Sequence, residues 1–343
     1  MKTSTFQLTN QNGVVVEFIS QGGKIISVKV PEGDRKVDIA LGYDTPEEFL
    51  TGDGYMGAIC GRLANRIGNG TFQLEGKTIK LFQNDRTNHL HGGKVGFNLK
   101  NWEVKPITKE GYHSAFQLSL LSHDGDENYP GNLQVEIVYA LNNQNEFLID
   151  IQATTDKTTA VNLTSHPYFN LNGVSSGKIF NHFLEINADA FTVLSDISVP
   201  TGEIRKVKNS DMDFTKPVKL SEVINSDEPQ IQLVNGLDHN WVINKKAGEM
   251  AFAARISEPV SGRGLEVFTT QPGIQVYTSM HFDGTQVGKN QMPFTPYCAI
   301  ALEAQNFPDA PNHANFPDCI LKPGETYHQK ICYKFLFLKE GNR

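Results

Sequence analysis

The sequence predicts an all-β fold, a large antiparallel β-sandwich with only short helical turns. Apolar and polar residues alternate with a period of two over many short segments, which is typical of strands with one covered face. Clusters of Gly, Pro, Asn and Asp separate these segments and reverse the chain. Amphipathic patterns of helical length are almost absent. Many short strands joined by such turns favour packed antiparallel sheets.

The clearest alternation lies in the middle of the chain, over residues 115–120, 133–139 and 147–151. Polar turns at 124–131 and 141–145 separate these three segments, so we expect antiparallel strands. Further strands are expected at 14–19, 25–30, 72–74, 79–82, 184–186, 265–269, 275–279 and 331–337. Only residues 46–50 and 219–224 have the pattern of a helical turn or two.

Size and composition indicate one globular unit. The chain has 343 residues without a linker or a shift in composition, so we expect a single domain over residues 1–343. The net charge of -7 gives no electrostatic reason to expect nucleic acid or an anionic membrane as a partner. Neither a secretory signal nor a bilayer-spanning run is visible, which favours a cytoplasmic protein. The four cysteines lack metal-binding spacing, and we expect free thiols.

The segment at 162–171 has a polar and an apolar face if it is extended. The polar face carries His166, Tyr168 and Asn170, and the apolar face carries Pro167, Phe169 and Leu171. A histidine held between an aromatic ring and an amide is suited to the wall of a pocket. A buried histidine whose neighbours satisfy it is the alternative interpretation.

A second informative strand is expected at 298–305. Glu303 shares its face with two alanines, while apolar residues take the opposite face. Small side chains beside a carboxylate leave space that either a neighbouring loop or a ligand fills. Gln275 and Tyr277 repeat this arrangement in the strand at 271–278.

Two segments resemble metal sites without meeting their requirements. His89 and His91 form an H-x-H pair, but the next carboxylate is Glu103, which lies too far along the chain for a metal site of this kind. The turn that begins at Asp124 starts like a calcium loop, but it lacks the glycine and the bidentate glutamate of an EF-hand. We therefore expect no metal in the site, and a structural cation such as calcium elsewhere is not excluded.

Two further groups are suited to binding hydroxyls. Arg66, preceded by Asn65, offers a rigid fork of donors. Asp238 and His239 precede Trp241, a grouping that suits vicinal hydroxyls and a stacked sugar face. Each of these signals is weak by itself.

Taken together, these motifs resemble the aldose 1-epimerases, or galactose mutarotases, from about residue 13 to residue 334. The matching segments, in order, are Asn-Arg at 65–66, Leu-His-Gly-Gly at 90–93, Asn-Leu-Thr-Ser-His-Pro-Tyr-Phe-Asn-Leu at 162–171, Gly-Leu-Asp-His at 236–239, Gln-Pro-Gly-Ile-Gln-Val-Tyr-Thr at 271–278 and Leu-Glu-Ala-Gln-Asn-Phe-Pro-Asp-Ala at 302–310. The resemblance implies the galactose mutarotase-like supersandwich. Ser165 departs from the family pattern, which has asparagine before the histidine.

The resemblance also implies a reaction, the exchange of α and β anomers of aldohexoses such as glucose and galactose. It assigns Glu303 as the base and His166 as the acid, with His91 near the ring oxygen or an adjacent hydroxyl. The implied substrate-binding residues are Asn65, Arg66, Asp238 and Gln275, of which Asn65 supports Arg66 and the other three bind hydroxyls. Ring opening needs only an acid and a base, so no organic cofactor is implied. A small sugar is the expected partner of a monomer or weak homodimer.

Other functions remain open from the sequence. An epimerase for hexose 6-phosphates would need a cationic cluster, and only Arg62 and Arg66 lie near the motifs. A non-catalytic sugar-binding module would not need both Glu303 and His166. A metal-dependent β-sandwich enzyme is a further alternative.

Overall fold

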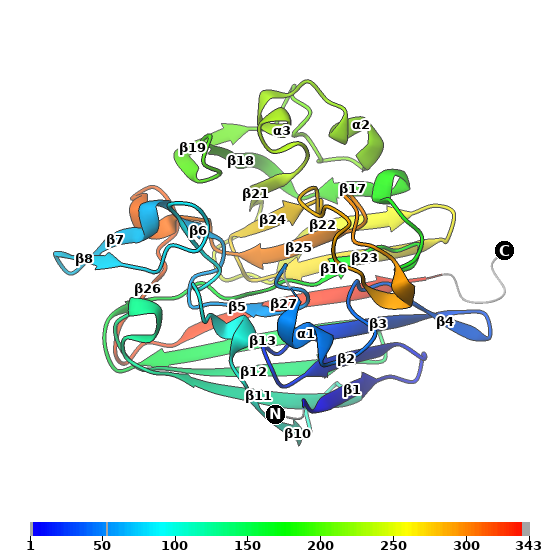
Figure 1. Ribbon diagram of the computed structural model, residues 1–343, viewed down its shortest axis with the longest axis horizontal. Helices are drawn as coiled ribbons and strands as arrows, with labels where there is room; N and C mark the ends of the chain where they lie inside the picture. The colour runs from blue at the N-terminus through cyan, green and yellow to red at the C-terminus, as the bar shows by residue number, and fades with distance from the viewer. Residues whose placement is uncertain (1–2, 53, 338–343) are drawn as a thin grey trace.

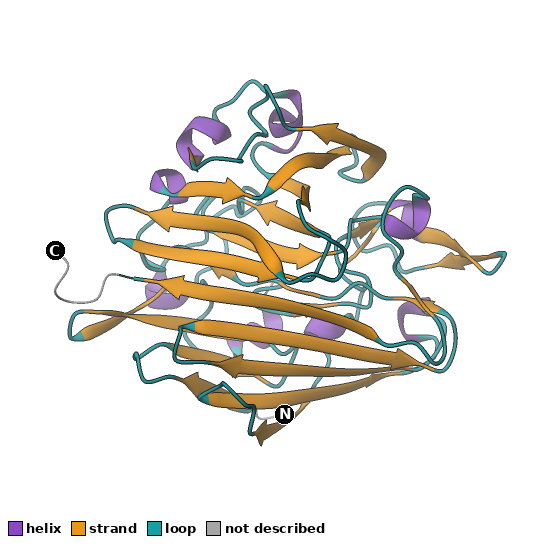
Figure 2. Ribbon diagram, turned by 180° about the vertical axis from the view of Figure 1, so that it is seen from behind, coloured by secondary structure: helices purple, strands orange, loops and turns teal. Residues whose placement is uncertain are grey.

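The computed structural model describes residues 3–52 and 54–337, which are built mainly from antiparallel strands (Figure 1). The largest sheet has nine strands, and its long strands form a continuous wall in Figure 2. In spatial order they are β10 (Glu103–Ile107), β11 (Ser114–Ser122), β12 (Leu133–Leu141), β13 (Glu146–Thr155), β27 (Tyr327–Leu336), β23 (Arg263–Thr269), β22 (Ala251–Glu258), β17 (Phe183–Ile186) and β20 (Val218–Lys219).

A six-stranded sheet packs against this wall and carries much of the site. In spatial order its strands are β16 (Tyr168–Phe169), β25 (Ile300–Gln305), β24 (Gly273–Tyr277), β21 (Asp238–Ile243), β18 (Ala188–Leu194) and β19 (Pro200–Lys206). Strand β25 therefore joins segments that lie far apart in the sequence.

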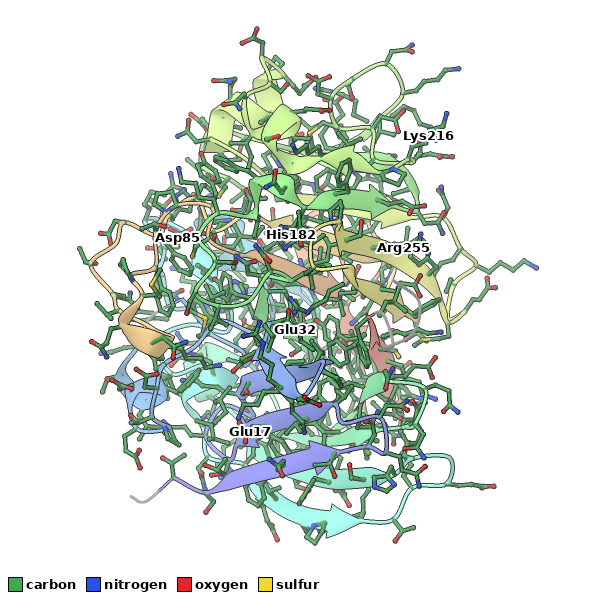
Figure 3. The ribbon with its side chains drawn as sticks, turned by 90° about the vertical axis from the view of Figure 1, so that its right-hand side faces the viewer. Glu17, Glu32, Asp85, His182, Lys216 and Arg255 are labelled. Atoms are coloured by element: carbon green, nitrogen blue, oxygen red, sulfur yellow. The ribbon has the colours of Figure 1, made fainter. Side chains whose placement is uncertain are left out.

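A four-stranded sheet completes the larger layers. Its strands are β1 (Thr5–Thr9), β2 (Val15–Ile19), β3 (Ile25–Glu32) and β4 (Arg35–Asp38). Glu32, which Figure 3 labels, lies at the end of β3. It forms an ion pair with Arg263 of β23 and so ties this sheet to the nine-stranded one.

The remaining elements are short. Four two-stranded ladders pair β5 (Ile59–Cys60) with β15 (Thr164–Ser165), β6 (Arg66–Ile67) with β9 (His89–Leu90), β7 (Thr71–Leu74) with β8 (Lys77–Lys80), and β14 (Thr159–Ala160) with β26 (Ile320–Leu321). The α-helices are α1 (Glu48–Thr51), α2 (Leu220–Ile224) and α3 (Pro229–Val234). Short 3₁₀ turns lie at Gly68–Gly70, Phe97–Leu99, Asp126–Asn128, Ile179–Asn181, Lys289–Gln291 and Ala310–Asn312.

The main core lies between the six-stranded and nine-stranded sheets. Trp241, Val276 and Leu302 belong to the same buried apolar cluster as Ile149 and Tyr333 of the larger sheet. The Tyr333 hydroxyl also donates a hydrogen bond of 3.0 Å to the Leu302 carbonyl. Because side chains alternate along a strand, the residues between these core positions face away from the core. That opposite face of the six-stranded sheet carries the candidate site.

The predicted all-β sandwich is confirmed, and a strand lies at or overlaps each expected segment. The expected helical turns at 46–50 and 219–224 correspond to α1 and α2, shifted by one or two residues. Helix α3 was not predicted, because the six residues that begin at Pro229 are too few to show a helical period. A single domain over residues 1–343 stays a prediction.

The segment at 162–171 is not one strand, so that prediction is wrong. Strand β15 pairs with β5, and β16 pairs with β25, which leaves His166 and Pro167 between two ladders. Proline has no N–H to donate and therefore cannot continue a ladder. Phe169 and Leu171 are buried in the main core, as expected.

The structure also bears on the cysteines and on the lengths of the helices. All four cysteines are buried free thiols, which confirms their use as small apolar residues. Within residues 3–52 and 54–337, no helix has the length and apolar character needed to cross a bilayer.

Candidate active site

A cavity of about 150 Å³ lies on the outward face of the six-stranded sheet, where β6 and β9 meet it. Six of the seven predicted site residues line this cavity: Asn65, Arg66, His91, His166, Asp238 and Glu303. A larger cavity of about 570 Å³ lies against β26 and β27 and contains none of the seven. The sequence motifs therefore converge on the smaller cavity.

Glu303 stands in the middle of β25, where every residue is buried. It lies directly opposite Gln275 of β24, while Leu302 points into the core. Burial raises the pKa of the Glu303 carboxyl well above its usual value, because a charge in this environment loses its hydration. The carboxyl Oε1 lies 3.4 Å from His166 Nε2, so the predicted acid and base are in contact.

His166 is held by its backbone and by neighbouring rings. Its N–H donates to the Ala58 carbonyl, and its own carbonyl accepts from the Gly57 N–H, both at 2.9 Å. The ring centroid lies 4.8 Å from that of Tyr168 and 5.3 Å from that of His91. Burial lowers the pKa of His166 to about 4. Before a sugar binds, the pair therefore favours a protonated Glu303 beside a neutral imidazole.

Neighbouring groups fix the proton of His91. The Asn65 backbone N–H donates to His91 Nδ1 at 3.1 Å, so the ring proton of the neutral imidazole must lie on Nε2. Burial lowers the pKa of His91 well below its usual value and keeps the ring neutral. Gly92 allows this geometry, because it adopts a φ of +91° and its Cβ position would lie 1.7 Å from the Gly61 carbonyl oxygen. His91 is therefore a neutral donor.

Arg66 and Asp238 form the polar end of the cavity. Arg66 Nη1 donates to Asp238 Oδ2 at 3.1 Å, and Arg66 Nε donates to Asp85 Oδ2 at 2.7 Å. Burial alone would raise the pKa of Asp238, but Arg66 and the Gln275 amide outweigh it and lower the pKa. Asn65 Oδ1 accepts from the Arg66 backbone N–H at 2.8 Å, which matches its expected support of Arg66.

Gln275 does not line the cavity, in contrast to its predicted contact with a hydroxyl. Its Nε2 donates to Asp238 Oδ1 at 2.7 Å, and the side chain is buried. Gln275 and Asp85 therefore orient Asp238 and Arg66 from behind. Nothing in the sequence pattern marks Asp85, which lies in a polar turn.

The aromatic lining also differs from expectation. Trp241 faces the core, where its Nε1 donates to the Met212 carbonyl at 3.1 Å, so it cannot stack on a sugar in this cavity. Rings from Tyr55, Tyr168 and Tyr277 line the cavity instead. The period of two placed Tyr168 and Tyr277 on the polar faces, and this signal could have identified both.

Three other residues singled out in the sequence do not line the cavity. Asn170 uses its amide to donate to the carbonyls of Gly177 and Cys298, at 2.9 Å each. His239 is buried, and its Nδ1 accepts from the Asp238 N–H at 3.3 Å. Among the described residues, the Ser165 hydroxyl has no hydrogen-bond partner. The serine that stands in place of the family's asparagine therefore forms no hydrogen bond with His166.

Two groups of side chains have residue types that can bind a metal. His91, His166 and Glu303 each offer a ligand atom within 4.8 Å of the others. However, Nδ1 of His91 accepts a hydrogen bond and Nε2 carries the proton, so neither nitrogen has a free lone pair for a metal. His89 faces away from the cavity, with Nε2 2.6 Å from the Tyr129 hydroxyl. The rings of His89 and His91 therefore have different partners and do not converge on one point.

The turn at 124–131 is held by protein groups. Asp126 accepts from Lys100 Nζ at 2.7 Å and from the Ser122 hydroxyl at 2.9 Å. Asp124 accepts from the Gly131 N–H and pairs with Lys157. Lysine side chains and backbone N–H groups therefore stabilise the carboxylates of this turn.

Comparisons with known proteins agree with this site. The family model described as aldose 1-epimerase matches residues 4–334. A galactose mutarotase from Bos taurus is 41% identical over 96% of this chain and 93% of its own length, and an aldose 1-epimerase from Escherichia coli K12 is 33% identical over 96% and 94%. A crystal structure of an aldose epimerase homologue from C. elegans superposes with a TM-score of 0.89 at 30% identity, covering 98% of this chain and 100% of that one. The chain belongs to the aldose 1-epimerase family.

Proposed function

We propose that this protein is an aldose 1-epimerase, or mutarotase, that interconverts the α and β anomers of aldohexoses such as D-galactose and D-glucose. The contact between Glu303 and His166 carries this proposal, because it places a matched acid and base beside groups suited to hydroxyls. The activity named for the relatives, galactose mutarotase or aldose 1-epimerase, supports it.

The chemistry requires one proton to move at each of two sugar oxygens. A base removes the proton of the anomeric hydroxyl as the bond from C1 to the ring oxygen breaks, and an acid protonates that ring oxygen. The open aldehyde then rotates about the bond from C1 to C2 and recloses with its other face exposed. Reclosure reverses both proton transfers and forms the other anomer.

Glu303 acts as the base and His166 as the acid in ring opening, and they exchange roles in reclosure. The pair needs a single proton, which must lie on His166 when opening begins. The free site favours that proton on Glu303, because both groups are buried. Sugar hydroxyls supply the hydrogen bonds that an ionised Glu303 requires, so binding promotes the reactive form.

The remaining groups hold the sugar. His91 donates from Nε2 near the ring oxygen, and Arg66 and Asp238 bind hydroxyls at the polar end. Asn65, Asp85 and Gln275 orient these groups through the hydrogen bonds described above. Ring opening proceeds without an organic cofactor or a metal, in a cytoplasmic monomer or weak homodimer.

A neutral sugar fits the cavity better than a sugar phosphate. Among the described residues, Arg66 is the one lysine or arginine that lines the cavity, and two aspartates already bind it. Arg62 faces elsewhere and donates to the carbonyls of Ser122, His123 and Pro130. A phosphate would therefore lack a free cation to pair with.

Polarimetry on freshly dissolved α-D-galactose, α-D-glucose and glucose 6-phosphate tests the proposal. We expect faster decay of rotation for the two neutral sugars than in buffer, and activity that survives treatment with a chelator. Faster decay for the phosphate alone would favour the hexose 6-phosphate epimerase. Sugar binding without faster decay would favour a binding module instead, and loss of activity with the chelator would favour a metal enzyme.

A further inference from the structure

His281 lies at the exposed rim of the cavity and has no role in the mechanism above. It lines the cavity, and its ring stacks on that of Tyr277, with centroids 6.0 Å apart and an interplanar angle of 30°. The His281 backbone N–H lies 3.4 Å from the Tyr277 hydroxyl. No residue within 3–52 or 54–337 forms a hydrogen bond with its ring nitrogens, so both are available to a ligand.

The rings form a path from the reacting groups to this rim. The His166 centroid lies 6.5 Å from that of Tyr277, and His281 lies one ring further out. In the proposed reaction His166 holds the ring oxygen of the sugar. C5 is bonded to that oxygen and carries C6, so the exocyclic hydroxymethyl group is the substituent that begins beside His166 and can extend along Tyr277.

Other polar groups of the cavity are already engaged. Arg66 and Asp238 bind each other. The Tyr168 hydroxyl donates to the Gly54 carbonyl at 2.8 Å. His281 thus differs from its neighbours, because it combines a stacked, oriented ring with unused nitrogen atoms.

We propose that His281 is a specificity-determining residue that hydrogen-bonds the C6 hydroxyl of the bound hexose. The assignment rests on the proposed mutarotase function and on His166 holding the ring oxygen. It defines the preferred substrates as aldohexoses with a free C6 hydroxyl, as opposed to 6-deoxy sugars and aldopentoses.

The test compares D-galactose with its 6-deoxy analogue, D-fucose, in the wild type and in three variants. His281→Phe keeps a ring on Tyr277 but removes both nitrogens, whereas His281→Asn retains a polar side chain without the ring. His113→Phe is the matched control, because His113 is also exposed and precedes β11 of the nine-stranded sheet, outside the cavity lining.

Preference is measured as the ratio of kcat/KM for D-galactose to kcat/KM for D-fucose. Because His281→Phe removes one hydrogen bond at an exposed rim, we expect this ratio to fall by about 3- to 10-fold, mainly through a higher KM for D-galactose. We expect kcat/KM for D-fucose to stay unchanged, His281→Asn to restore part of the preference, and His113→Phe to behave as wild type. Equal loss for both sugars, or no loss for either, would overturn the proposal. If the wild type accelerates neither sugar, the proposed function fails, which is a distinguishable result.

Discussion

Replacement of Glu303 by glutamine removes the proposed base while it preserves the shape of the side chain. Glu303 lies 3.4 Å from His166 and has an Oε2 atom without a protein partner among the described residues. The amide of glutamine cannot accept the anomeric proton. Because burial already favours the neutral carboxyl in the free site, a neutral amide replaces a neutral group.

Two magnitudes follow from this geometry. A positioned base contributes about 10² to 10⁴ in rate, so Glu303→Gln should lower kcat by at least about 100-fold, or about 2.7 kcal/mol of activation free energy. The free energy of unfolding should change by less than about 1.5 kcal/mol, because one neutral polar group replaces another in the same space.

Polarimetry on fresh α-D-galactose measures the rate, and denaturant unfolding measures the stability. Glu266→Gln is a matched control, since Glu266 pairs with Arg255 on the nine-stranded sheet and does not line the cavity. We expect Glu266→Gln to retain the wild-type rate. A folded Glu303→Gln protein with nearly wild-type activity would refute the assignment of Glu303 as the base.

Three further predictions follow from the site. The pKa of His166 is lowered to about 4 and that of Glu303 is raised, so the pair carries one proton across neutral pH. We therefore expect kcat/KM to stay constant from pH 7 to 5. It should fall only near pH 4, where the pair binds a second proton. A pH–rate profile that declines near 6.5 would contradict this reasoning. Asp85→Asn weakens the charge-assisted hydrogen bond from Arg66 Nε, so KM should rise about 3- to 10-fold with a smaller change in kcat. An unchanged KM in steady-state assays would argue against an orienting role for Asp85. Ser165→Ala removes a hydroxyl that lacks a hydrogen-bond partner among the described residues. The free energy of unfolding should therefore change by less than about 1 kcal/mol, and the rate should stay within about twofold of wild type. A large loss of rate would show that Ser165 orients His166.

The alternating pattern predicted the faces of Glu303 and Gln275, but not which side chains would lie beside them. Glu303 could be placed on the polar face of its strand because its apolar neighbours define the other face. That β25 lies between β16 and β24 depends on long-range pairing, which local periodicity does not encode. For the same reason local periodicity could not indicate that Gln275 would hydrogen-bond Asp238 and not line the cavity.

Two other differences have local causes. Pro167 interrupts the expected strand, yet His166 and Tyr168 still lie with their rings side by side because each flanking ladder is anchored to a different strand. In an extended strand His89 and His91 would point the same way, but His91 has a positive φ of 48° and follows the end of β9, which breaks the alternation. A period of two holds only while the backbone remains extended.

Exchange between the two anomers at equilibrium is the most immediate readout of the proposed acid–base pair. Two-dimensional exchange NMR on equilibrated D-galactose detects interconversion of the α and β forms without any net change in composition. We expect exchange cross-peaks with the wild type, and their strong reduction with Glu303→Gln and with His166→Asn in folded proteins. Anomer exchange no faster than in buffer with the wild type, or equally fast exchange with both variants, would show that Glu303 and His166 do not act as proposed.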